Sequence, residues 1–182
     1  MLTSDAPDNK QVVGMIGVYF MAWELSRRGY VAVPTVRNVK SSDLLVTNLD
    51  GTRAVTLQVK TRKGTDFPVA SFPEEPTDYD AGSQWLEAQV SVSPTRFFSF
   101  VQIDEDGSTV NYWVMPSEEV LKEVKRVRDE YLGGRYSNKP KRLATRGKNI
   151  GKPIRDQGTW PIEPPTAYRN GLGIIETALR TT

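Results

Sequence analysis

The stretch DLLVTNLDGTRAVTLQVKT, residues 43–61, decides the fold because its pattern predicts a chain that turns back on itself. Asp50-Gly51 is a strong signal for a two-residue hairpin turn, and alternating apolar and polar residues flank it on both sides. If these two residues occupy the centre of the turn, Leu44 pairs with Leu57, and the apolar residues of both strands share one face. The sequence therefore predicts an antiparallel hairpin with a defined register.

The opposite face of this hairpin collects three polar side chains. The same register puts Asp43 directly opposite Gln58 and places Lys60 on the diagonal, where neighbouring side chains are about 7 to 8 Å apart. A carboxylate, an amide oxygen and an ammonium group in one patch suit a metal ion and a phosphate. The alternative is that Gln58 and Lys60 lie on the solvated face of an edge strand.

The residues before the hairpin predict a long helix. Residues 12–23 carry no charge and are apolar nearly all round a helical wheel, and Asp8 precedes them as a candidate N-cap. Such a helix is expected to be buried on most sides. Glu24 is its first acidic residue, and we expect it to point partly into the protein. It can reach the Asp43 patch or pair with Arg28 at the i+4 position.

The remaining elements complete an α/β pattern. Strands are expected over 30–35, 96–103 and 111–116, a short helix over 84–89, and an amphipathic helix from Ser117 to Gly133-Gly134. We expect residues 1–132 to form the main domain. Residues 133–182 form a basic, Pro- and Gly-containing extension, and the apolar run near its end predicts a short helix that packs back on the core.

Composition excludes several kinds of chemistry. The 182 residues include no cysteine and no histidine, which removes thiol catalysis, disulfides, tetrahedral zinc sites and an imidazole base. Carboxylate and carbonyl oxygens remain, and these are ligands for hard cations. The first ten residues lack the features of a signal peptide, and no apolar run approaches about 18 residues, so we expect a cytoplasmic protein outside the membrane.

Charge is distributed unevenly, although the net charge is only +2. Eight Lys or Arg residues fall between 27 and 63, and eight more between 135 and 155 with no acid among them. Basic blocks of this kind favour contact with a nucleic acid, although a solvated surface is the ordinary alternative. The acidic stretch 66–87 leaves a third reading, a regulator that binds other proteins. The candidate nucleic-acid contacts are Arg27, Arg28, Arg37, Lys40, Arg62, Lys63, Lys141, Arg142, Arg146 and Lys148.

Three segments together resemble the PD-(D/E)XK nuclease superfamily, which includes restriction endonucleases and archaeal Holliday-junction resolvases. They are GVYFMAWELSRRGYVAVPT (17–35), SSDLLVTN (41–48) and LQVKTRKG (57–64). The resemblance implies a restriction-endonuclease-like αβββαβ core, in which helices flank a small mixed central sheet, with an extended C-terminal segment.

The resemblance also implies an activity and a site. By position, Asp43, Gln58 and the backbone carbonyl of Val59 would bind Mg²⁺, with Mn²⁺ as an alternative, and Lys60 would be catalytic. Glu24 would assist at the same site. The implied reaction is phosphodiester hydrolysis in DNA, with RNA left open, and compact members of the superfamily are often homodimers.

Two residues depart from the superfamily pattern. Ser42 stands where a proline usually precedes the aspartate, and Gln58 stands where Asp or Glu is usual. An amide oxygen can coordinate a hard cation but brings no negative charge. The alternative function is therefore a nuclease-fold module that no longer cuts and instead binds nucleic acid or another protein.

Overall fold

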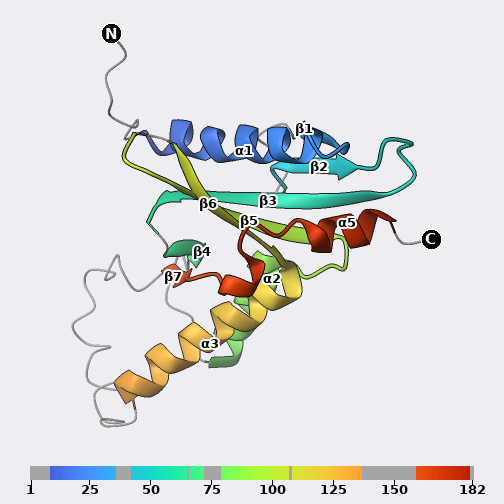
Figure 1. Cartoon of the computed structure of the whole chain (residues 1–182). Helices are drawn as coiled ribbons and strands as arrows, with labels where there is room; N and C mark the ends of the chain where they lie inside the picture. The colour runs from blue at the N-terminus through green and yellow to red at the C-terminus, as the bar shows by residue number, and fades with distance from the viewer. Residues whose placement is uncertain are drawn as a thin grey trace.

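The chain folds around a mixed five-stranded sheet with helices on both faces (Figure 1). A computed structural model describes residues 9–35, 42–64, 66–71, 79–106, 108–136 and 159–180. Its elements in chain order are α1 (Lys10–Ser26), β1 (Val31–Pro34), β2 (Leu44–Thr47), β3 (Ala54–Lys63), β4 (Phe67–Ser71), α2 (Tyr79–Val90), β5 (Arg96–Ile103), β6 (Thr109–Pro116), α3 (Ser117–Tyr136), β7 (Thr159–Ile162), the 3₁₀ turn η1 (Thr166–Tyr168) and α5 (Gly173–Arg180). The expected α/β class is confirmed.

The central sheet has the strand order β1-β2-β3-β5-β6. β1, β2 and β3 form an antiparallel meander, β5 runs parallel to β3, and β6 returns antiparallel to β5. The predicted hairpin register is confirmed, because Leu44 pairs with Leu57 and Val46 with Val55. Gly51 has φ +69°, a conformation that glycine adopts without steric cost.

Each face of the sheet carries its own hydrophobic core. On one face, α1 and α5 pack on the side chains of β3 that include Leu57 and Val59, together with Tyr112 and Val114 of β6. On the other face, α2, α3, β4 and β7 cover Phe98, Phe100, Trp113 and Met115. Alternate residues along a strand point to opposite faces, so the two cores divide the sheet residue by residue.

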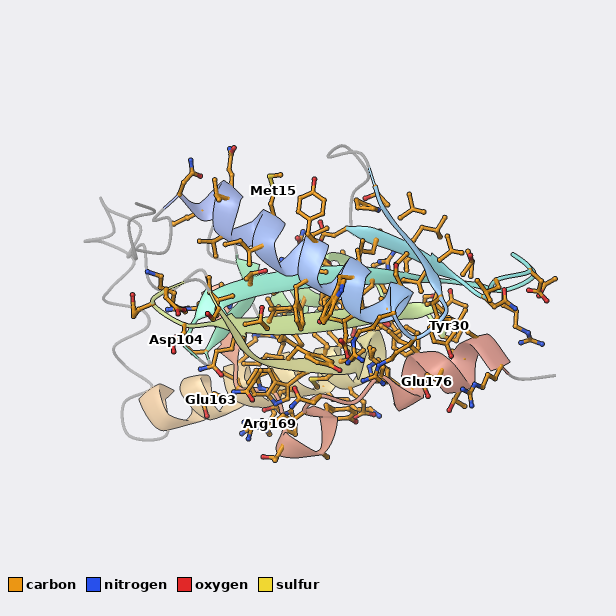
Figure 2. The ribbon with its side chains drawn as sticks, turned by 45° about the horizontal axis from the view of Figure 1, so that its top comes forward. Met15, Tyr30, Asp104, Glu163, Arg169 and Glu176 are labelled. Carbon is orange, nitrogen blue, oxygen red and sulfur yellow. The ribbon has the colours of Figure 1, made fainter. Side chains whose placement is uncertain are left out.

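α1 is less enclosed than its sequence predicts. Its buried residues are Gly17, Met21, Glu24 and Leu25, all on the side that meets the sheet, whereas Met15 points away from it (Figure 2). Its outer side faces away from the sheet, and Val12, Met15, Tyr19 and Trp23 are 41 to 59% exposed there. The side chain of Asn9 caps the helix by accepting a hydrogen bond from the backbone N–H of Gln11 at 2.9 Å, and the predicted cap, Asp8, lies outside the described residues.

Two elements were not expected from the sequence. β4 and β7 form a separate two-stranded antiparallel sheet, in which Pro68 lies opposite Pro161 (Figure 1). α3 also continues through the predicted stop at Gly133-Gly134 and ends at Tyr136. α5, by contrast, forms over the expected apolar run, and its Ile175 joins the core beneath α1.

No helix in the described part of the chain is long and apolar enough to cross a membrane.

Candidate functional site

Two polar residues of the hairpin, Gln58 and Lys60, lie on the sheet face that points away from α1. Val59 and Leu57 belong to the core beneath α1, so Gln58 and Lys60, their neighbours on β3, point to the other face. Asp43 directly precedes β2, and its backbone N–H donates at 2.9 Å to the carbonyl of Leu57, the residue that Leu44 pairs with, so the regular register ends at Leu44. The Asp43 carboxylate is close enough to Lys60 to act on the pKa of that lysine, and Gln58 shares the face of Lys60, whereas the predicted pairing of Asp43 with Gln58 is not part of the observed register.

The carboxylate of Asp43 continues the sheet where β2 begins. Its Oδ2 accepts a hydrogen bond from the backbone N–H of Val59 at 2.7 Å, a position that a carbonyl of a longer strand would fill. The carbonyl of Val59 lies along the same edge of β3, because N–H and C=O of one strand residue point to the same side. Asp43 therefore has a structural role as well as its candidate role as a ligand.

Lys60 is the unusual cation of this face. Its side chain is partly buried, and burial lowers the pKa of the Lys60 ammonium below its ordinary value, while the nearby Asp43 carboxylate opposes that shift. Perturbed lysines beside a carboxylate are frequent at functional sites, although structural pairs show the same behaviour. Gln58, two residues before Lys60 on β3, is also partly buried.

Glu24 does not join them. It lies on α1, which packs on the opposite face of the sheet, so the sheet itself separates Glu24 from Lys60. An apolar helix packs on the apolar side of the hairpin and takes its acidic residue to that side. The expectation that Glu24 reaches the Asp43 patch is wrong for this structure, and its alternative role as a partner of Arg28 is confirmed at 2.9 Å.

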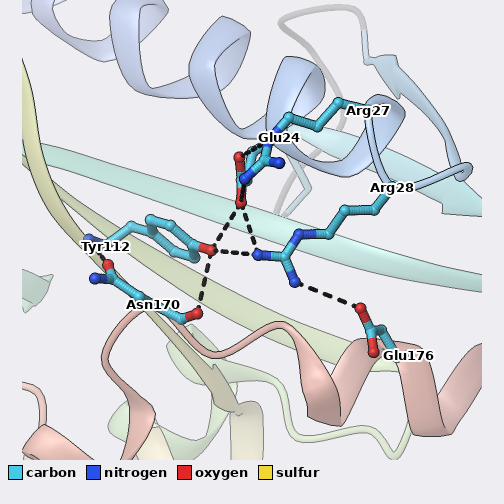
Figure 3. Close-up of polar contacts among 6 residues, drawn as sticks. All are labelled: Glu24, Arg27, Arg28, Tyr112, Asn170 and Glu176. Carbon is cyan, nitrogen blue, oxygen red and sulfur yellow. Dashed lines mark hydrogen bonds and ion pairs between the residues drawn. The ribbon is translucent and has the colours of Figure 1, made fainter.

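Glu24 instead organises a polar network between α1, β6 and the segment before α5 (Figure 3). Its buried carboxylate accepts hydrogen bonds from Arg27 at 2.5 and 2.8 Å, from Arg28 at 2.9 Å and from the Tyr112 hydroxyl at 3.0 Å. Burial would raise the pKa of Glu24, but these donors outweigh it and hold the pKa below its ordinary value. Burial and the Glu24 carboxylate raise the pKa of Tyr112 to about 12.

Tyr112 and Asn170 are the members of this network that sequence reasoning missed. The Tyr112 hydroxyl also donates to the carbonyl of Asn170 at 3.2 Å, and the Asn170 side chain accepts from the backbone N–H of Tyr112 at 3.2 Å. Asn170 adopts a left-handed conformation with φ +52°. The alternation along 111–116 indicates that Tyr112 and Val114 share a face, but nothing in the sequence links Tyr112 to residues far from it along the chain.

The predicted nucleic-acid contacts divide into three groups. Arg27 and Arg28 are bound to Glu24, and Arg28 also pairs with Glu176 at 3.5 Å. Arg62 lies on the face of Lys60 but donates to the backbone of Asp66 at 2.7 Å, and Lys63 pairs with Glu105 at 2.9 Å. The others lie outside the described residues: Arg37, Lys40, Lys141, Arg142, Arg146 and Lys148.

Two pockets of the described chain lie away from Gln58 and Lys60. In the described ranges, no group of three Asp, Glu, His or Cys side chains is placed to hold a metal ion. An open pocket of about 350 Å³ lies over the Glu24 network, lined in part by Phe20, Trp23 and Asn111. A second, of about 300 Å³, lies between the 48–50 turn and α5. Neither pocket is lined by Lys60.

Comparison of the chain with protein-family models, with curated proteins and with solved structures found no match.

Proposed function

We propose that the chain is a metal-dependent nuclease that hydrolyses phosphodiester bonds in DNA at the Asp43, Gln58 and Lys60 face of β3. The observation that carries this proposal is the position of Lys60, a partly buried lysine whose pKa is lowered, beside a single carboxylate. The chain places no histidine there, so a lysine is the available group to orient water or to meet the charge of a phosphate.

The order of elements supports the same proposal. α1, β1, β2, β3, α2 and β5 follow one another as αβββαβ, with only β4 inserted before α2. This is the order that the resemblance to the PD-(D/E)XK superfamily implies. It supports the assignment of the metal-binding positions to the start of β2 and the middle of β3.

The donor set fits a magnesium ion, although with little negative charge. Asp43 would bind it through Oδ1, because the hydrogen bond from Val59 engages Oδ2. The amide oxygen of Gln58 and the carbonyl of Val59 would supply two neutral oxygen ligands, the kind that hard cations accept. When bound, the ion would lower the pKa of a coordinated water and stabilise charge on the phosphate. Lys60 would hold the phosphate or the water, and Arg62 would face the same strand surface.

One observation favours a second function. The face of Lys60 holds one carboxylate of the proposed ligand set, since Glu24 lies across the sheet. A site with a single negative ligand binds a divalent cation more weakly than one with two or three. The second candidate is therefore a nuclease-fold module that binds nucleic acid without cutting it.

A cleavage panel tests the first function. Linear, branched, single-stranded and supercoiled DNA are incubated with Mg²⁺ or Mn²⁺, and EDTA is the negative control. We expect cleavage that Lys60→Ala lowers at least about 100-fold, the effect usual for a group that stabilises developing charge. Lys122→Ala is the matched control, because Lys122 is an exposed lysine of α3 paired with Glu118 and Glu119. DNA binding without any cut by wild type would leave the second candidate.

Gln58→Glu tests the ligand set separately. A second carboxylate beside Asp43 should tighten Mn²⁺ binding about tenfold, because each added negative ligand strengthens the attraction for a divalent cation. Calorimetric titration of Mn²⁺ into wild type and Gln58→Glu measures this directly. Unchanged or weaker affinity would remove Gln58 from the proposed ligands while leaving the cleavage test open.

A further inference from the structure

The open pocket over the Glu24 network brings aromatic side chains and arginines together. It has a volume of about 350 Å³ and lies between the C-terminal half of α1 and the start of β6, the edge strand of the sheet. Phe20 and Trp23 line it from α1, and Tyr112 lines it from β6. Pockets of this size that are apolar, with a few well-placed polar groups, commonly bind small molecules.

Trp23 gives the pocket an exposed aromatic surface. The residue is 59% exposed, although tryptophan is usually well buried. The Phe20 ring lies 6.0 Å from the Trp23 ring and 5.7 Å from the Tyr112 ring, centroid to centroid, so the three rings form one continuous apolar wall. A flat ring can pack on such a wall by the offset or edge-to-face contacts that aromatic pairs prefer.

Arg27 adds a cation to this wall and keeps one edge of its guanidinium open. Its Nε and Nη2 atoms donate to the Glu24 carboxylate at 2.5 and 2.8 Å, and its guanidinium carbon lies 5.3 Å from the centre of the Trp23 ring. The opposite edge, formed by Nη1 and the second N–H of Nη2, has no partner among the described residues, and the side chain is 49% exposed. Two N–H groups at one edge of a guanidinium match the two oxygens of a carboxylate.

The Glu24 network holds this arginine in place before any ligand binds. The buried carboxylate of Glu24 is itself held by Arg28 at 2.9 Å and by the Tyr112 hydroxyl at 3.0 Å. Figure 3 shows Arg27 and Arg28 reaching the carboxylate from the same end of α1. An arginine that is already fixed on one edge loses less conformational entropy when it binds an anion with the other.

The charges around the pocket favour an anion with a single negative charge. Arg27 and Arg28 line the pocket together with one acid, Glu24. Arg28 has a second acidic partner, Glu176, at 3.5 Å, and Arg169 adds a third arginine at the rim. These side chains together leave one positive charge in excess.

The C-terminal end of α1 does not oppose such an anion. Free carbonyls at a helix end carry partial negative charge. Here the carbonyls of Trp23, Leu25 and Ser26 already accept hydrogen bonds from the backbone N–H groups of residues 27–30. The arginines, and not the helix end, therefore determine the charge that a ligand meets.

We infer that the pocket is a binding site for a small aromatic carboxylate. The ring packs on Trp23 and Phe20, and the carboxylate binds the open edge of Arg27. A phosphate monoester fits less well, because it brings nearly two negative charges close to Glu24 at neutral pH. The inference goes beyond the proposed nuclease function and does not depend on it, since Lys60 does not line this pocket.

Titration calorimetry with benzoate tests the inference. We expect saturable binding with a dissociation constant of about 1 mM or lower. Benzamide keeps the ring without the charge, and cyclohexanecarboxylate keeps the charge without the flat ring. Each should bind at least about fivefold more weakly. The inference is overturned if benzoate does not bind saturably or if either analogue binds equally well. Tighter binding of phenyl phosphate overturns the assignment of a carboxylate.

Two matched pairs of variants locate the binding site. Arg27→Met should weaken benzoate binding at least about tenfold, because it removes the charged pair. Arg126→Met is its control, since Arg126 pairs with Glu123 on α3 through the same spacing of three residues. Trp23→Leu should weaken binding about fivefold, and Tyr19→Leu should not, because Tyr19 is 58% exposed on the same helix but does not line the pocket. Equal losses in controls and pocket variants contradict the inference.

Nuclear magnetic resonance locates the ligand in the wild-type protein, so this test does not depend on how the variants fold. The chain has four tryptophans, and the indole N–H signal of Trp23 is assigned by its loss in Trp23→Phe. Benzoate should shift this signal more than the other three. A shift confined to the other indoles places the ligand elsewhere and overturns the inference.

Discussion

Glu24 and Asp43 are the two carboxylates that the motif assigns to one site, and they have very different surroundings. Glu24 has two arginines and a tyrosine hydroxyl as hydrogen-bond donors, and its pKa is lowered. Asp43 has one backbone N–H from Val59 and a lysine whose own pKa is lowered by burial. Fully paired buried groups usually maintain a fold, whereas a charge that its surroundings disfavour is the better sign of function. The difference shows that the groups around each carboxylate indicate its role better than its position in the motif does.

The largest expected effect on stability comes from removing the Glu24 carboxylate. Glu24→Ala should lower the free energy of unfolding by about 3 kcal/mol, because it removes several charge-assisted hydrogen bonds and leaves Arg28 with the longer pair to Glu176 in place of its 2.9 Å partner. Chemical denaturation measures the loss. Glu24→Gln, which keeps the shape and part of the hydrogen bonding, should cost about half as much. If cleavage per folded molecule falls sharply in Glu24→Gln, the separation of the two carboxylates is wrong.

The contact between α1 and β3 can be tested with a matched pair of glycines. A Cβ at Gly17 would collide with the hydroxyl of Thr61, whereas a Cβ at Gly14 meets open space. Gly17→Ala should destabilise by about 2 kcal/mol through overpacking. Gly14→Ala should stabilise by about 0.5 to 1 kcal/mol, because alanine favours the helix. Thermal unfolding compares the two, and equal shifts would contradict the close packing of α1 on the sheet.

The smallest effect is a difference in pH dependence. The pKa of Glu24 is lowered from 4.5, so its stabilisation is present above that pH and is lost as pH falls through the folded-state pKa. The pKa of Lys60 is lowered from 10.5, so between its folded-state value and 10.5 the unfolded chain binds more protons and stability rises with pH. Glu24→Gln should flatten the acid limb of the stability curve, and Lys60→Met the alkaline limb.

At neutral pH Lys60→Met and Glu24→Gln should change the free energy of unfolding in opposite directions. Lys60→Met should raise the free energy of unfolding by up to about 1 kcal/mol, because it removes the cost of a partly buried charge. Glu24→Gln should lower it. Urea titrations from acid to alkaline pH provide both curves, and a destabilised Lys60→Met would make Lys60 a structural residue.

The hairpin is the part of the fold that the sequence predicts best. Asp50-Gly51 lies at the centre of the turn, although the hydrogen bond from Asn48 to Arg53 closes a loop of residues 49–52 in place of the predicted two-residue turn. Alternation around it leaves one register, in which Leu44 meets Leu57. The strands over 96–103 and 111–116 form at the expected places, and α2 covers the expected residues 84–89 but already begins at Tyr79. These are local patterns, in which turn residues and period determine the structure.

The same sequence patterns also predict that Glu24 lies apart from Lys60. An apolar helix covers the apolar face of the hairpin, so an acidic residue on that helix belongs with Leu57 and not with Lys60. The pairing of β4 with β7 was not within reach. Pro68 and Pro161 both lack the N–H of a regular ladder, and the partners lie far apart along the chain. Contacts between residues so far apart in the chain produce no periodic pattern in the sequence.

β7 and α5 lie near the end of the chain, so the two cores are completed late during synthesis. Ile162 of β7 completes the core beneath α2 and α3, and Ile175 and Leu179 of α5 complete the core beneath α1. A chain emerging from the ribosome can form the hairpin early, because its contacts are local. It can close neither core until residues 159–180 have been synthesised, and pairing across such distances is slow. During that interval Phe67 can already pack on Phe100 and Trp113, but the side that Ile162 covers stays open to solvent and to the chaperones that bind exposed aromatic side chains.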